Sequence, residues 1–192
     1  MKRKWYFLIC ALILIVYAGY LFHSISYIVK NPVIPVQNEK LESVLIKWVY
    51  DKSSRISLTS AKIISKEVMK TDKPLLLLAL IEMESQFVPS AFSSKEAIGL
   101  TQVMFEDSKG KDIHGKALIK SGIIKEKRDL FDITPSIQAG NLILDGYLIQ
   151  SKGDVPKALE RYLGGKDGAY LIRILSNLAN LYVLTSKTET KQ

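Results

Sequence analysis

The sequence predicts an all-α, mainly helical protein made of one N-terminal transmembrane helix and one helical domain. Three observations support this prediction. Residues 5–29 form an apolar run without Asp, Glu, Lys or Arg. After residue 38, apolar residues recur at helical spacing in almost every segment, and no stretch alternates convincingly with the two-residue period of a strand. The 192 residues leave room for the membrane helix and one domain of roughly 150 residues.

The apolar run at residues 5–29 has the properties of a retained signal-anchor. As a helix rising about 1.5 Å per residue, it would span roughly 37 Å, which is enough to cross a bilayer. Basic residues 2–4 precede it, so residues 1–4 should stay in the cytoplasm while the rest crosses. A cleaved signal peptide, cut near Ala18 or Ser26, is the alternative, but the run exceeds the about 7 to 15 residues of a typical signal core. We expect a single-pass protein of the inner (cytoplasmic) membrane whose domain lies in the periplasm or cell-wall space.

Beyond the anchor, we expect a linker at residues 30–38, a domain at 39–185 and a frayed tail at 186–192. The linker holds two of the six prolines and shows no helical pattern. The single cysteine, Cys10, lies in the membrane run, so the domain must fold without a disulfide. Residues 31–192 contain 23 basic and 19 acidic residues, which leave about +4, and this balance suits an anionic partner such as cell wall or lipid headgroups. Nucleic acid is not expected, because the domain is exported and lacks a basic block.

Helical spacing predicts the elements of the domain in order. Two helices have apolar faces within residues 41–49 and 58–68. Asp72 should cap a helix that begins at Pro74 and runs towards Pro89, and its nearly uniform apolar character predicts a buried, central position. Loops are expected near 86–96 and 109–133, and further helices near 97–108, from Thr134-Pro135 to Leu148, from Pro156 to Leu163 and from Asp167 to Leu184.

Two carboxylates, Glu82 and Glu84, end the leucine-rich helix "LLLLALIEMES". Residues two apart on a helix point about 200° away from each other, so at most one of them can serve a given site. A carboxylate at the end of a buried apolar helix loses hydration of its charged form, which raises its pKa and suits a general acid. Both faces are apolar, and a glutamate that simply reaches the surface is the alternative. Periodicity alone therefore does not choose between the two residues.

Ser85, Phe87, Pro89 and Ala91 follow Glu84, and then comes "AIGLTQ" at 97–102. This order of residues resembles the soluble lytic transglycosylase type of lysozyme-like domain. The resemblance continues through "DLFDITPSIQAGNLIL" at 129–144 and "ALERYLGG" at 158–165, and so covers roughly residues 70–165. It implies a lysozyme-like transglycosylase domain in which Glu84 is the single catalytic acid/base and Glu82 is accessory or structural.

The resemblance also implies substrate-binding residues, each with a plain structural alternative. A serine at a helix end can bond to its own backbone, a glutamine can be merely exposed, and a methionine or tyrosine can belong to the core. At Leu163 the family usually has asparagine, and Ile98 and Phe105 also depart from its pattern. No cofactor is implied, and His23 and His114 have no partners at metal-ligand spacing. The implied substrate-binding residues are Ser85, Gly99, Leu100, Gln102, Met104 and Tyr162.

The implied activity is a peptidoglycan lytic transglycosylase, a glycan lyase that cleaves the bond between N-acetylmuramic acid and N-acetylglucosamine and forms 1,6-anhydro ends. One glutamate suffices, whereas ordinary glycosidases use two carboxylates. A hydrolytic muramidase resembling goose-type lysozymes is one alternative, and would need a further aspartate among Asp107, Asp112, Asp129 and Asp132. A non-catalytic glycan-binding scaffold is another. The expected partners are glycan strands and the inner membrane; family members serve either wall remodelling or a secretion or conjugation apparatus, and the sequence does not choose.

Overall fold

The computed structural model describes residues 38–186. The expected membrane helix, almost all of the expected linker and all but the first residue of the expected tail lie outside these residues. Within the described part, no helix is both long enough and apolar enough to span a membrane. The described residues belong to one compact unit of the chain, which begins at Val36.

The described part is mainly helical, in agreement with the predicted fold class. The expected helices near 41–49, 58–68, 74–85, 134–148, 156–163 and 167–184 are all present, with ends that differ by a few residues. In chain order the elements are α2 (Asn38–Lys52), α3 (Leu58–Val68), α4 (Pro74–Ser85), β1 (Ala97–Ile98), β2 (Val103–Met104), α5 (Gly115–Lys120), the 3-10 helix η1 (Lys127–Phe131), α6 (Ile133–Gln150), α7 (Val155–Leu163) and α8 (Gly168–Ser186).

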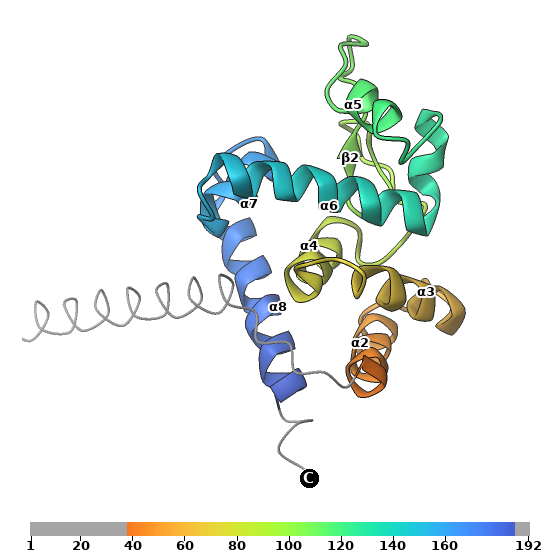
Figure 1. Ribbon diagram of the computed structural model, residues 1–192, viewed down its shortest axis with the longest axis vertical. Helices are drawn as coiled ribbons and strands as arrows, with labels where there is room; N and C mark the ends of the chain where they lie inside the picture. The colour runs from red at the N-terminus through yellow and green to blue at the C-terminus, as the bar shows by residue number, and fades with distance from the viewer. Residues whose placement is uncertain (1–37, 187–192) are drawn as a thin grey trace, which may run out of the picture. The chain divides into compact units, whose positions relative to one another are not determined.

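Helix α4 occupies the centre of the described part, as its apolar composition predicts. All residues from Pro74 to Ile81 are buried. Figure 1 shows α4 with α3 on one side and α8 on the other, and α4 packs on both. Full burial of a leucine side chain stabilises a fold by roughly 1.5–3 kcal/mol, so this helix is a major contributor to the core. Its last turn carries both glutamates to the edge of that core.

The start of α4 differs from the prediction, and the chain turns sharply after its last residue. The N-cap residue is Lys73 rather than Asp72, and no side chain caps this end. Pro74 in the first turn has no N–H to satisfy, which reduces the need for a cap. At the other end, Gln86 and Phe87 both have positive φ values of 52° and 63°. These left-handed residues turn the chain away directly after Glu84, and Phe87 is fully buried.

The helix expected from Ala97 is wrong, because this segment forms a short β-hairpin. Strands β1 and β2 pair antiparallel, with Ala97 opposite Met104 and Ile98 opposite Val103. Gly99 and Gln102 have positive φ values of 76° and 48°, which a continuous right-handed helix excludes. The tight turn between the strands therefore overrides the helical spacing of the apolar residues.

The stretch at 109–133 is also more regular than expected, since it contains α5 and η1. Leu118 and Leu130 from these elements join a core cluster with Ile98 and Val103 of the hairpin and Ala139 of α6. In the view of Figure 1, α5 and the hairpin lie on the opposite side of α6 from α2 and α3. The hairpin is thus held between α6 and the α5 segment.

Candidate active site

Glu84 lies in the last turn of α4, half-buried, and its carboxylate accepts a hydrogen bond from the hydroxyl of Tyr170 in α8. Burial raises the pKa of Glu84 from 4.5 to about 7, and the hydrogen bond from Tyr170 offsets part of that rise. Desolvation disfavours the carboxylate, whereas a donor aimed at it favours the charged form. A substantial fraction of Glu84 is therefore protonated near neutral pH, as a general acid requires.

Tyr170 is placed by the first turn of α8. The carboxylate of Asp167 accepts hydrogen bonds from the backbone N–H groups of Ala169 and Tyr170, at 2.9 and 3.1 Å, and so caps the helix start. Because α8 packs along α4, its first turn delivers the tyrosine ring to the end of α4. Tyr170 is 7% exposed. Burial, and then the nearby charge of Glu84, raise the pKa of Tyr170 and keep its hydroxyl protonated as a donor.

Tyr162 of α7 lies close enough to Glu84 for the carboxylate to act on it electrostatically. Burial is the main reason that the pKa of Tyr162 is raised, and the charge of Glu84 is the next. Its hydroxyl, however, donates to the backbone carbonyl of Thr101 at 2.8 Å rather than to Glu84. The ring of Tyr147 stands edge-on to Tyr162, with centroids 6.3 Å apart. Tyr162 thus joins α7 to the hairpin turn beside the glutamate.

Glu82 faces away from Glu84, as the 200° rotation predicts. Its carboxylate accepts a hydrogen bond from the indole N–H of Trp48 at 2.8 Å and forms an ion pair with Lys52 at 3.1 Å. The ammonium of Lys52 also lies 4.4 Å from the centre of the Trp48 ring. All these partners belong to α2, so Glu82 links α4 to α2. This arrangement supports the structural role that the resemblance implied for Glu82.

The hairpin turn is the second part of the site, and Gly99 is required in it by close packing. A Cβ atom on Gly99 would lie 2.0 Å from the carbonyl oxygen of Leu130. Gln102 donates its side-chain amide to the carbonyls of Ala91 and Gly99, at 3.2 and 3.0 Å. Both residues therefore shape the turn itself, and these contacts are made without a ligand. Their expected contact with sugar stays a prediction.

Two of the expected substrate-binding residues, Ser85 and Leu100, have buried side chains. The hydroxyl of Ser85 donates to the backbone carbonyl of Ile81 at 3.1 Å, and the residue is only 5% exposed. Leu100 is fully buried. The Ser85 hydroxyl is thus bonded within α4 and the Leu100 side chain is enclosed by the core. Their expected contact with substrate stays a prediction. Met104 is half-buried at the end of β2, and its expected role stays a prediction.

Three residues around the site were missing from the expectation. Tyr170 contacts Glu84 directly, while Thr101 and Ser136 tie the hairpin turn to α6 through a hydrogen bond of 2.7 Å from the Thr101 hydroxyl to the Ser136 carbonyl. Gly140 lets the two approach, since a Cβ atom there would lie 2.4 Å from Thr101 Cγ2. A glycine inside a predicted helix was a usable signal of close packing. No local pattern marked Tyr170, which lies 86 residues from its partner.

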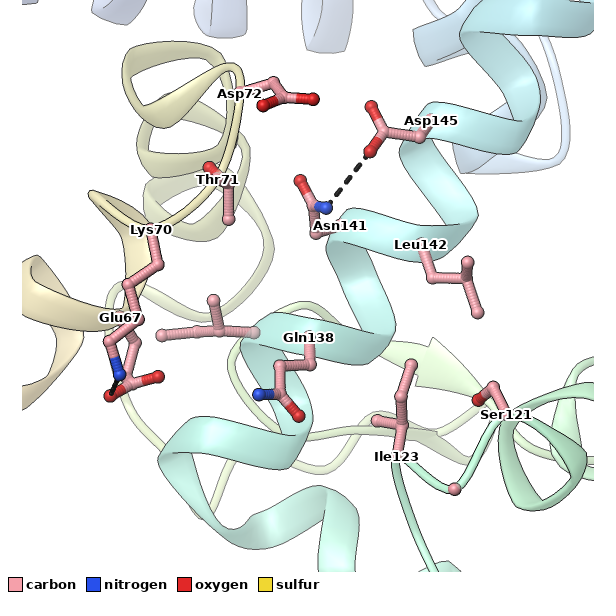
Figure 2. A pocket seen from close by; sticks show the side chains of 12 residues that line it. Glu67, Lys70, Thr71, Asp72, Ser121, Ile123, Gln138, Asn141, Leu142 and Asp145 are labelled. Carbon is pink, nitrogen blue, oxygen red and sulfur yellow. Dashed lines mark hydrogen bonds and ion pairs between the residues drawn. The ribbon is translucent and has the colours of Figure 1, made fainter.

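A separate cavity of about 540 Å³ lies at the other end of α4, between the turn that precedes this helix and α6. Figure 2 shows its polar lining, with Asn141 hydrogen-bonded to Asp145 and Lys70 close to Glu67. Lys73 pairs with Asp145 at 3.1 Å. These charges largely compensate one another, and none of the three residues Glu84, Tyr162 and Tyr170 lines this cavity. It is therefore distinct from the candidate active site.

Comparisons with known proteins identify the family of the chain. Among residues 38–186, no group of three or more His, Cys, Asp and Glu side chains could hold a metal ion. Neither a curated protein nor a solved structure matches the chain. A family profile described as the transglycosylase SLT domain matches residues 61–169, more than half of the chain. The match spans Glu84, the hairpin turn and Tyr162, and it ends just before Tyr170. The chain therefore belongs to the transglycosylase SLT domain family, of the lysozyme-like lytic transglycosylase type.

Proposed function

We propose that the protein is a peptidoglycan lytic transglycosylase in which Glu84 is the single acid/base. It cleaves the β-1,4 bond between N-acetylmuramic acid and N-acetylglucosamine and leaves a 1,6-anhydro end. The observation that carries the proposal is the half-buried carboxylate with a pKa of about 7, hydrogen-bonded by Tyr170. A glutamate of this kind can hold its proton until a sugar oxygen arrives and can still ionise afterwards.

In the first step, protonated Glu84 donates its proton to the glycosidic oxygen as the bond to muramic acid C1 breaks. Positive charge develops on the muramoyl ring, and the N-acetyl carbonyl of the same sugar stabilises it. Glu84 becomes negatively charged in this step. The hydroxyl of Tyr170, which donates to Glu84, stabilises that charge and so favours proton transfer.

In the second step, the muramoyl C6 hydroxyl attacks C1 and gives its proton to ionised Glu84. The bond from O6 to C1 closes the anhydro ring, and the enzyme returns to its starting protonation state. Attack from within the same sugar replaces water with a nucleophile that is already in place, which lowers the entropic cost. The cycle consumes no water and requires no cofactor.

The surroundings of the four aspartates available to a hydrolytic muramidase do not favour that alternative. Asp107, Asp112 and Asp129 each accept hydrogen bonds from backbone N–H groups in turns. Asp132 occupies the N-cap position of α6. Within residues 38–186, burial and Tyr170 are the causes of the pKa shift of Glu84, and no second carboxylate contributes to it. This supports a mechanism with one carboxylate.

The proposal places the enzyme in the inner membrane through residues 5–29, with its domain in the periplasm or cell-wall space. The supporting observation is the charge-free apolar run preceded by basic residues 2–4. Anchoring would hold the domain next to its polymeric substrate. Protease protection of the N-terminus in sealed inverted and right-side-out vesicles tests this orientation.

The decisive experiment is digestion of purified peptidoglycan by the full-length protein, with the products analysed by mass spectrometry. We expect fragments with anhydro ends, which are one water lighter than hydrolysed ends, and we expect none from Glu84→Gln. Hydrolysed ends would instead indicate a muramidase. Equal release of fragments by both proteins would contradict the role of Glu84, and no release by either would favour a glycan-binding scaffold.

A further inference from the structure

The positive charge of the described part is concentrated in one short segment. Residues 38–106 contain nine basic and nine acidic residues, and residues 126–186 contain seven of each. Between them, residues 107–125 contain five lysines and only two aspartates, for a local charge of +3. We call residues 107–125 the basic lobe. Its charge equals the whole net charge of the described part, while the flanking segments are balanced.

The lysine side chains of the basic lobe are exposed, whereas its aspartates are turned towards the backbone. Asp107 accepts hydrogen bonds from the backbone N–H groups of Lys109 and Lys111, both at 2.9 Å, and Asp112 accepts one from Lys116 at 2.8 Å. Within residues 38–186, no ion pair involves a lysine of the lobe. The ammonium groups thus face solvent. The exposed lysines are Lys109, Lys111, Lys116, Lys120 and Lys125.

The basic lobe is fastened to the same hairpin that borders Glu84. It follows β2, and the backbone carbonyl of Phe105 accepts hydrogen bonds from the N–H groups of Ile113 and Gly115 at 3.1 Å. The Phe105 ring lies against Gly115, where a Cβ atom would come within 2.7 Å of it. The ring of His114 stands edge-on to Tyr147, which in turn contacts Tyr162 beside Glu84. A polymer that lies along the hairpin at Glu84 would therefore extend towards the lobe.

We propose that the basic lobe binds the carboxylates of the peptide arms of a glycan strand whose sugar chain is held at Glu84. This inference rests on the proposed function, which makes peptide-bearing glycan the substrate. The peptide arms are flexible and carry carboxylates at intervals along the strand. Lysines, which are compact charges on flexible stems, suit such a partner better than a rigid bidentate site would. The lobe would select strands that still carry their peptides.

An anionic membrane surface is the competing partner, and the lobe fits it less well. A helix that binds in the plane of a membrane needs a continuous apolar face. Helix α5 has only six residues, and the exposed large apolar side chains of the lobe are Ile113 and Ile119, at 40% and 45%. A hydrated polyanion requires no such face. The geometry of the lobe therefore favours the peptide carboxylates.

The test compares two triple variants with the same change in charge. The lobe variant carries Lys111→Glu, Lys116→Glu and Lys120→Glu, and the control variant carries Lys40→Glu, Lys62→Glu and Lys66→Glu on α2 and α3. All six lysines are exposed, and none has an ion pair within the described residues. Each triple is introduced into the full chain together with Glu84→Gln, in detergent, so that the polymer is not consumed. Equal thermal unfolding of the two proteins verifies that both are folded.

Binding is measured by cosedimentation with purified peptidoglycan and by a pull-down with glycan strands freed of peptides by an amidase. We expect the lobe variant to bind intact peptidoglycan roughly tenfold more weakly at low salt, with the difference shrinking at high salt. We expect unchanged binding to peptide-free strands, and no comparable loss in the control variant.

Three results would overturn the inference: equal loss in both variants, equal loss on peptide-free strands, or loss of binding to anionic phosphatidylglycerol vesicles without loss on peptidoglycan. Failure of the proposal for the basic lobe can be distinguished from failure of the proposed catalytic function. Cleavage by the protein with Glu84 intact, combined with unchanged binding by the lobe variant, would refute the lobe alone. Absence of cleavage combined with the expected binding loss would refute the catalytic proposal alone.

Discussion

The two sides of the last turn of α4 carry the same type of side chain in opposite environments. On the α2 side, Glu82 meets a cation and an indole N–H, from Lys52 and Trp48. On the α8 side, Glu84 meets the buried hydroxyl of Tyr170 and no cation among the described residues. The first carboxylate is compensated by an opposite charge, whereas the second is desolvated and its pKa rises to about 7. The difference between the two environments comes from the helix that each glutamate faces, since both residues lie in the same turn of α4.

The largest difference between the two sides should appear in catalysis. Glu84→Gln keeps the shape of the side chain but removes the transferable proton, so the rate of anhydro-product formation should fall roughly 10³-fold. Glu82→Gln is the matched control, with the same chemical change two residues away, and its rate per folded molecule should stay within about threefold of the unaltered protein. A larger loss from Glu82→Gln would remove the distinction between the two sides.

The next effect concerns stability and its dependence on pH. The pKa of Glu84 is about 7 in the folded protein, above the ordinary value of 4.5 that applies to the unfolded chain. The folded protein therefore retains a proton that the unfolded chain loses as the pH rises towards 7. The free energy of unfolding should thus fall by about 3 kcal/mol between pH 4.5 and pH 7.5 through this residue. Urea unfolding of Glu84→Gln should lack that component, and parallel pH profiles of the two proteins would contradict the raised pKa.

A smaller effect is expected from Tyr170→Phe, which removes only a hydroxyl. The hydrogen bond from Tyr170 lowers the pKa of Glu84, so its loss should move that pKa above 7. Activity that depends on protonated Glu84 is present below the pKa of Glu84 and lost above it. The alkaline limb of the pH–rate profile should therefore move to higher pH in Tyr170→Phe. The maximal rate should fall about tenfold, because the carboxylate formed by proton transfer loses a donor. A purely structural role for Tyr170 would lower the rate without moving the limb.

The smallest effect belongs to the α2 side. Glu82→Gln should destabilise the protein by about 1 kcal/mol, because Lys52 loses its partner in a location that is only partly shielded from solvent. Trp48→Phe should cost a similar amount through loss of the hydrogen bond to Glu82. The two losses should not add in the double variant, since the residues form one network. Full additivity in urea unfolding would indicate that the network is not cooperative.

Most of the helical architecture could be predicted from local patterns, and the exceptions have identifiable causes. Helix α4 could be predicted because its apolar residues, Pro74 in its first turn and the turn that follows it all indicate a helix with these ends. The hairpin at 97–104 was missed because its apolar residues also fit helical spacing. Its turn has positive φ at Gly99 and Gln102, and the close packing of Gly99 against Leu130 and Ser136 leaves no room for a side chain. Motif order indicates proximity to a site but not the direction of a side chain, so it did not indicate that Leu100 and Ser85 are buried.

The sequence by itself determined the helical class, the central buried helix and the family to which the chain belongs, and its motif order favoured Glu84 over Glu82 as the candidate acid. Each of these depends on neighbours within a few turns or on the order of motifs along the chain. Only the tertiary structure decided which side chains face Glu84, since Tyr170 reaches it from 86 residues away. It also decided that the basic lobe adjoins the hairpin, through contacts of Phe105. Such contacts depend on how the helices pack against one another, and the periodicity of residues along the chain does not indicate them.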